Sequence, residues 1–160
     1  MRLTVLAVGR LKAGPEKTLA GDYLARAGAL GRRAGLSRVQ VSEAAESQAQ
    51  TAAARMADEA KQLAAALPSR AFTVVLDERG TALTSVAFAD LIRQHLDRGT
   101  QDMAFLIGGP DGHGQALRDG GGLLLSLGPM TWPHRLVRVM LFEQIYRAVT
   151  IMVNHPYHRP

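Results

Sequence analysis

The chain has 160 residues, of which 47% are hydrophobic and 21% charged, which indicates one globular domain and excludes two large domains or a wholly disordered chain. It contains no cysteine, which excludes a disulfide framework, a thiolate nucleophile and an iron–sulfur site, and no apolar run approaches the roughly 18 residues that span a bilayer, which predicts a cytoplasmic protein. The formal net charge of +5 lies entirely in residues 1–70, where 11 Lys and Arg face 6 Asp and Glu, whereas residues 71–160 hold 8 of each.

The predicted elements alternate between short apolar runs, typical of buried strands, and longer segments with apolar residues three or four apart, typical of helices. In chain order they are a strand at 3–8, a helix at 15–33, a strand at 39–41, a helix from the capping-box pattern Ser47–Gln50 to Leu67, a strand at 72–76, a turn at 77–80, a helix from Thr84 or Ser85 to Gly99, a strand at 103–107, a short helix at 115–119, a glycine break at 120–122, a strand at 123–127 and a helix at 134–152.

This alternation predicts an α/β fold: a mainly parallel sheet with helices on both faces, in a single domain over residues 1–160. Ligands bind such sheets beyond the carboxyl ends of the strands. Three strand-end loops carry the chemistry that a site needs, at 76–80, 108–114 and 127–133.

The glycine-rich loop 108–114 is neither a Walker loop, because no Gly-Lys-Ser/Thr follows, nor a G-x-G-x-x-G motif. Glycines allow a backbone to approach a flat ligand closely, but a tight strand-to-helix turn accounts for the same residues. No histidine spacing is typical of a metal site, so no metal is expected.

The tail after residue 153 is aromatic and cationic, whereas chain ends that fray are usually small and polar. It carries His155, Tyr157, His158 and Arg159 within a few residues. The last helix has apolar residues around most of its circumference and needs more than one neighbour, which predicts a homodimer.

Four blocks of the second half, taken together, resemble one family. They are Leu106-Ile107-Gly108-Gly109-Pro110-Asp111-Gly112, Thr131-Trp132-Pro133-His134-Arg135-Leu136-Val137-Arg138-Val139, Glu143-Gln144-Ile145-Tyr146-Arg147-Ala148 and Asn154-His155-Pro156-Tyr157-His158-Arg159. Their order and spacing resemble those of the ribosomal RNA large subunit methyltransferase H family, within the SPOUT methyltransferases, and the likeness covers essentially the whole chain.

The resemblance implies a C-terminal trefoil knot, a homodimer and S-adenosylmethionine (SAM, also written AdoMet) as the methyl donor. It implies methylation of N3 of a pseudouridine in helix 69 of 23S ribosomal RNA, on the assembled ribosome. By matching position, the implied cofactor-binding residues come from the three strand-end loops. They are Leu76, Gly108, Leu127, Gly128, Pro129, Met130, Thr131 and Trp132.

The chemistry of N3 methylation requires a proton to leave the imide, which a neutral histidine accepts near pH 7. His155 and His158 are the candidates for this base, with no choice between them. Arg147 and Arg159 are expected to hold a phosphate or the uracil carbonyls, and Tyr157 completes the candidate catalytic residues. A tail of six residues extends about 20 Å, enough to enter a partner's cleft.

Two questions stay open at the level of sequence. A non-catalytic RNA-binding or ribosome-assembly module on the same fold is the alternative to an enzyme. The arginine-rich first part predicts an RNA partner, with contacts at Arg10, Lys12, Arg32 and Arg33, but a GC-rich coding bias toward arginine accounts equally well for the composition.

Overall fold

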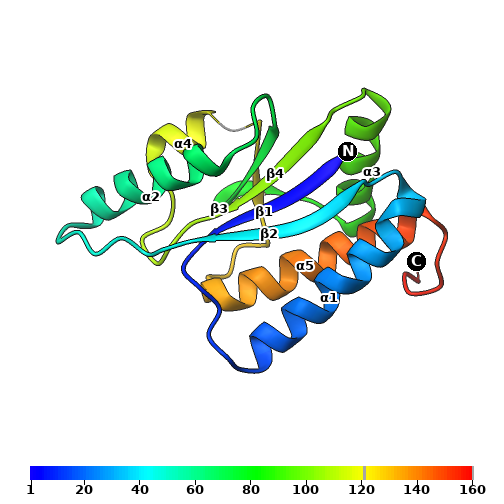
Figure 1. The fold of residues 1–160 in the computed structure, drawn as a ribbon, viewed down its shortest axis with the longest axis horizontal. Helices are drawn as coiled ribbons and strands as arrows, with labels where there is room; N and C mark the ends of the chain where they lie inside the picture. Colours follow the sequence, from blue (N-terminus) through cyan, green and yellow to red (C-terminus); the bar gives the residue numbers. More distant parts are fainter. Residues whose placement is uncertain (121, 160) are drawn as a thin grey trace.

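A computed structural model describes residues 1–120 and 122–159; Gly121 and Pro160 lie outside it, so the predicted glycine break at 120–122 and the end of the tail are described only in part. Five parallel strands form one sheet in the order β2-β1-β4-β3-β5 (Figure 1). In chain order the elements are β1 (Arg2–Val8), α1 (Pro15–Gly31), a 3-10 turn (Arg32–Ala34), β2 (Arg38–Ala44), α2 (Ala52–Ala66), β3 (Phe72–Ala82), α3 (Ser85–Asp97), β4 (Asp102–Ile107), α4 (Gln115–Gly120), β5 (Leu123–Ser126) and α5 (His134–Met152).

Helices cover both faces of the sheet, as the alternating pattern predicts (Figure 1). Successive side chains of a strand point to opposite faces, and the core divides accordingly. In β1, Leu3, Val5 and Ala7 pack in the larger core with α1, α3 and α5, whereas Leu6 and Val8 pack in the smaller core with Leu63 of α2. The predicted α/β class with a parallel sheet is confirmed.

The segment predicted as a turn at 77–80 is instead part of a longer strand. β3 runs to Ala82, and both Leu76 and Thr81 pair with Leu125 of β5, so the residues between them form a wide bulge. The Asp77 carboxylate accepts the Arg79 backbone N–H at 3.0 Å, which gives the bulge its turn-like sequence. The prediction of a strand end at Leu76 was wrong because this local bond resembles that of a true turn.

The second helix also begins later than predicted. Thr51 caps α2 by accepting the Ala54 backbone N–H at 3.2 Å, whereas the predicted capping box at Ser47–Gln50 does not form. Ser47 binds side chains of α2 instead, because its hydroxyl donates to Asp58 at 3.0 Å. The β2–α2 connection is therefore held against the helix rather than being its first turn.

The last helix is covered within the subunit more fully than the sequence pattern suggests. α5 packs against α1 and α3 and over β4, and nine of its residues are buried. These neighbours cover the buried part of its apolar circumference without a partner subunit, while Leu136 near its start is exposed. The helix face therefore no longer supplies the argument for a homodimer.

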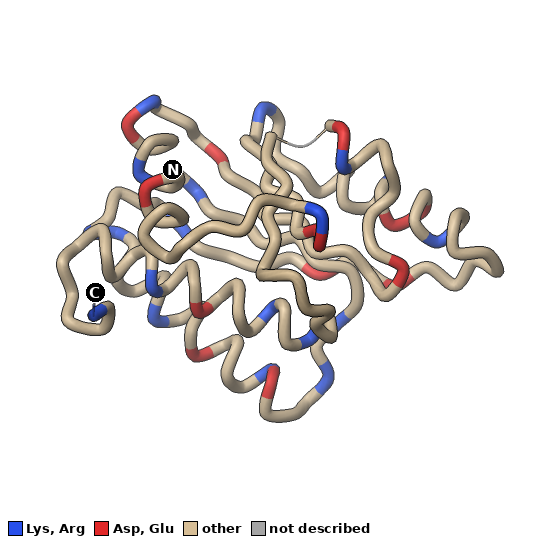
Figure 2. The backbone as a smooth tube through the Cα atoms, turned by 180° about the vertical axis from the view of Figure 1, so that it is seen from behind, with Lys and Arg blue, Asp and Glu red and all other residues tan. Residues whose placement is uncertain are grey.

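The four predicted RNA contacts form two groups rather than one. Arg10 and Lys12 precede α1, and Arg32 and Arg33 follow it, so a helix of 17 residues, about 26 Å long, separates the pairs. Figure 2 shows acidic residues interspersed with the basic ones rather than one basic face.

Candidate active site

The carboxyl edge of the sheet holds a cavity of about 370 Å³. Three connections surround it: the β3 bulge, the glycine loop after β4, and the loop between β5 and α5. This is the position at which open α/β sheets bind ligands, and the volume is that of a small-molecule site.

The cavity brings together seven of the eight predicted cofactor-binding residues. Pro129 is not among its lining residues. The seven that line it are Leu76, Gly108, Leu127, Gly128, Met130, Thr131 and Trp132.

The glycine loop owes its shape to a tight turn. The Gly112 backbone N–H donates to the Gly109 carbonyl at 2.9 Å, Pro110 occupies the second position, and Gly112 has φ +77°. The turn folds back over Gly108, where a Cβ would lie 3.0 Å from the Gly112 backbone. A side chain at position 108 therefore distorts the turn before it fills the cavity.

Polar side chains outside the eight predicted cofactor-binding residues also line the cavity. Arg118 Nη1 lies 3.7 Å from Asp77 Oδ2 in an ion pair, and the Asp111 carboxylate accepts a hydrogen bond from Arg55 of α2. Glu78 and Arg79 line the cavity too and form no ion pair with another described residue. A polyphosphate site gathers several unpaired cations, whereas the described lining has one such arginine among backbone, apolar side chains and paired charges. This lining suits a ligand without phosphate groups.

Two histidines line the cavity, and neither belongs to the tail. Burial lowers the pKa of His113, whose Nε2 lies 3.3 Å from the Leu106 carbonyl. Burial also lowers the pKa of His134, the first residue of α5. Both rings are therefore neutral near pH 7.

The tail lies at the opposite end of α5. His134 lines the cavity, and the helix ends at Met152, about 27 Å away along its axis. The tail then folds back on its own helix, where the Tyr157 hydroxyl donates to Glu143 at 3.0 Å. Arg147 donates to the same carboxylate and lies 4.8 Å from the centre of the Tyr157 ring.

None of the five candidate catalytic residues lines the described cavity of its own subunit: His155, Tyr157, His158, Arg159 and Arg147. His155 is held at the helix end, because its backbone N–H donates to the Thr150 carbonyl at 2.9 Å and its Nδ1 accepts the Tyr157 N–H at 3.2 Å. Asn154 has φ +54° and turns the chain there. The structure thus groups the tail with Arg147, but away from the cavity.

Comparisons with known proteins agree over the full length. Residues 1–158 match a family model described as a predicted SPOUT methyltransferase. The chain is 51% identical to the ribosomal RNA large subunit methyltransferase H of Allorhizobium ampelinum and 52% identical to that of Rhizobium meliloti, in each case over 99% of both chains. The chain belongs to the ribosomal RNA large subunit methyltransferase H family.

Membership of the ribosomal RNA large subunit methyltransferase H family confirms the resemblance seen in the sequence and the prediction of a methyltransferase. A distant structural match is the SpoU methyltransferase AviRb from Streptomyces viridochromogenes, solved in complex with the cofactor AdoMet, with TM-score 0.43, 18% identity and coverage of 95% of this chain and 58% of that chain. The trefoil knot stays a prediction.

Residues 1–120 and 122–159 hold no group of three or more His, Asp or Glu side chains that could bind a metal ion. No helix in the same residues is long and apolar enough to cross a membrane.

Proposed function

We propose that this chain transfers a methyl group from SAM to N3 of a pseudouridine in helix 69 of 23S ribosomal RNA, on the assembled ribosome. The observation that carries the proposal is full-length identity near 50% to proteins named ribosomal RNA large subunit methyltransferase H. A cytoplasmic location belongs to the same proposal, because ribosomes are the substrate.

The cavity fits SAM. Backbone N–H and C=O groups of the glycine loop and of residues 127–132 suit the edge of an adenine, and Leu76, Ile107 and Leu125 supply an apolar lining. Gly108 and Gly109 allow the loop to pack closely on Gly112 and on Glu59, which holds its backbone at the edge of the cavity. When bound, SAM supplies an electrophilic methyl group.

The chain's own residues must then bind the pseudouridine, exclude water and accept one proton from N3. N3 forms a bond to the methyl carbon only as its proton passes to a base, and His155 and His158 stay the proposed candidates. Arg147 and Arg159 would hold the uracil carbonyls or a phosphate, and Tyr157 would orient the base. Positioning supplies much of the rate enhancement in such a transfer.

We infer that the active site is composite, with the loops of one subunit and the tail of the other. The argument is the placement of the tail, which leaves the far end of α5 and folds back on Glu143 and Arg147, so that none of the candidate catalytic residues lines the cavity of its own subunit. A second cavity, of about 470 Å³, shares residues 125–128 with the first and is otherwise lined by residues of α1, α3 and α5 and by the end of β3 and the segment that follows it. Exposed apolar residues flank both cavities and suit a dimer interface: Leu19, Met130, Trp132 and Leu136.

Complementation between two inactive variants tests this arrangement. One variant ends after Val153 and keeps its loops; the other is Gly108→Val, which deforms the glycine turn and keeps its tail. Each homodimer is expected to be inactive. A heterodimer regains one complete site if the tail acts across the interface, so activity should return to about half the wild-type rate per dimer.

Verified heterodimers without activity would contradict tail donation, provided that both variants remain dimeric by light scattering. Calorimetry separates the enzyme from the non-catalytic RNA-binding or ribosome-assembly alternative. Wild-type protein is expected to bind SAM with micromolar affinity, about −8 kcal/mol. Absence of heat and of a thermal shift would favour the alternative.

A further inference from the structure

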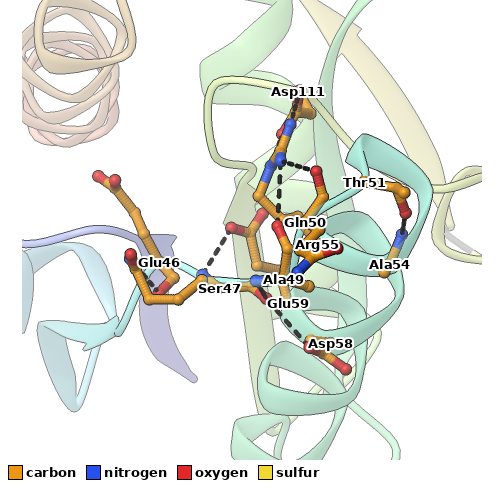
Figure 3. Close-up of polar contacts among 11 residues, drawn as sticks. Glu46, Ser47, Ala49, Gln50, Thr51, Ala54, Arg55, Asp58, Glu59 and Asp111 are labelled. Carbon is orange, nitrogen blue, oxygen red and sulfur yellow. Dashed lines mark hydrogen bonds and ion pairs between the residues drawn. The ribbon is translucent and has the colours of Figure 1, made fainter.

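Arg55, in the first turn of α2, ties three segments of the chain together (Figure 3). Its Nε and Nη2 donate to the two carboxylate oxygens of Asp111 at 2.7 and 3.1 Å. Its Nη1 donates to the carbonyls of Ala49 and Gln50 at 3.1 and 3.3 Å. The whole guanidinium fork is therefore engaged, on the glycine loop at one side and on the β2–α2 connection at the other.

Asp111 is the part of this network that reaches the cavity. It is the third residue of the Gly109–Gly112 turn and lines the cavity together with Gly108. Pro110 and Gly112 determine the shape of the turn, whereas its orientation relative to the sheet depends on contacts with residues outside it. The bidentate grip of Arg55 is such a contact, and its two parallel bonds fix direction as well as distance.

Glu59 supports the same loop one helical turn further along α2. Glu59 is 4% exposed, and its Oε1 accepts a hydrogen bond from the Ser47 backbone N–H at 3.1 Å. Its Oε2 lies against Gly109, where a Cβ would come within 2.7 Å of it. The loop is thus confined by a buried carboxylate under Gly109 and an ion pair at Asp111.

We propose that Arg55 is a positioning residue for the methyl-donor cavity, acting through Asp111. The inference rests on the proposed function, because it concerns the same cavity. The Arg55 and Asp111 side chains are 31% and 24% exposed, so solvent screens the pair and limits its contribution to the stability of the fold. We expect the pair to act on ligand binding instead. If only a fraction of the molecules hold the loop in the orientation that binds SAM, the apparent affinity falls to that fraction of its full value.

The test compares Arg55→Met, which keeps much of the stem and removes the fork, with Arg55→Lys, which keeps the charge. The control is Arg93→Met, because Arg93 forms an exposed pair with Asp90 on α3, away from the cavity. SAM affinity is measured by calorimetry and by the fluorescence of Trp132, which lines the cavity and is the sole tryptophan.

Arg55→Met should raise the SAM dissociation constant about tenfold, with kcat at saturating SAM and the melting temperature close to those of Arg93→Met. Arg55→Lys should recover part of the affinity, because one ammonium can bind Asp111 but cannot bridge all four acceptors. A double-mutant cycle with Asp111→Asn should show the two effects to be strongly non-additive.

Equal SAM affinity in wild type and Arg55→Met would overturn this inference and leave the proposed function standing. A loss of affinity matched by a fall in melting temperature, with no rescue by lysine, would also overturn it, since that is the signature of a structural role. If the wild-type protein itself gives no heat or fluorescence change with SAM, the proposed function and this inference fail together.

Discussion

Arg138 carries a charge almost completely out of solvent, with its side chain 2% exposed. Its guanidinium donates to the carbonyls of Val8 and Gly9 at the carboxyl end of β1, and to the Glu43 carboxylate. Burial lowers the pKa of Arg138, while Glu43 opposes that shift. This one residue joins the start of α5, beside the cavity, to the ends of β1 and β2.

Arg138→Met should therefore lower the free energy of unfolding by about 3 kcal/mol, because it leaves buried oxygen atoms without their cation. Denaturant unfolding measures the change. Arg135→Met is the matched control, since Arg135 lies on the same helix but is exposed, and it should change stability by less than about 0.5 kcal/mol. Equal losses in the two variants would show that the Arg138 contacts contribute nothing specific.

At the scale of elements, the sequence predicts where helices and strands lie better than how they end. The ten main strands and helices all occur near their predicted positions, because their apolar periodicity is long and regular. The Ser47–Gln50 pattern and the Asp77–Gly80 turn misled because Ser47 and Asp77 each accept the backbone N–H two residues further on, a local bond that also occurs at helix starts and chain reversals. Pairing of β3 with β5 across the bulge is a long-range effect that local residues do not specify.

For the candidate site, the sequence likewise predicts the position of the loops better than the contacts that their residues form. The loops that line the cavity follow from the strand ends. Asp111 and His134 stand in the blocks that resemble the family, but the sequence predicts no role for them, since their contacts depend on α2 and on the packing of α5. The place of the tail was equally hidden, because only the length and direction of α5 separate it from the cavity.

The docking of the tail on α5 should depend on pH. Burial, with Tyr23 and Glu143, raises the pKa of Tyr157 above its ordinary value near 10. Above about pH 10, Tyr157 keeps its proton in the folded protein and loses it in the unfolded chain. Its contribution to the free energy of unfolding is therefore complete below about pH 10 and is lost as the pH rises further. Ultraviolet titration should show one of the three tyrosines ionising last, and Tyr157→Phe should remove that step.

A titration in which all tyrosines ionise together near pH 10, or in which Tyr157→Phe removes an earlier step, would contradict the described tail contact. Tyr146→Phe is unsuitable as a control because its ring packs 4.7 Å from Tyr157. Circular dichroism at the same pH values verifies that the sheet and helices persist through the titration.

At the scale of the whole molecule, the fold places the cavity at the start of α5 and the tail beyond the end of the same helix, folded back on Glu143. Within one subunit, the proposed cofactor-binding residues and the proposed catalytic residues therefore do not line one cavity. The proposed dimer resolves this separation, and the two basic groups at the ends of α1 would contact RNA phosphates on either side.

The most direct measurement is mass mapping of 23S ribosomal RNA after purified protein and isotope-labelled SAM are incubated with ribosomes from a strain that lacks the modification. The account predicts one labelled methyl group on N3 of a helix 69 pseudouridine, absent when the protein ends after Val153. No incorporated methyl group, or a methyl group only elsewhere in the RNA, from protein that binds SAM would contradict it.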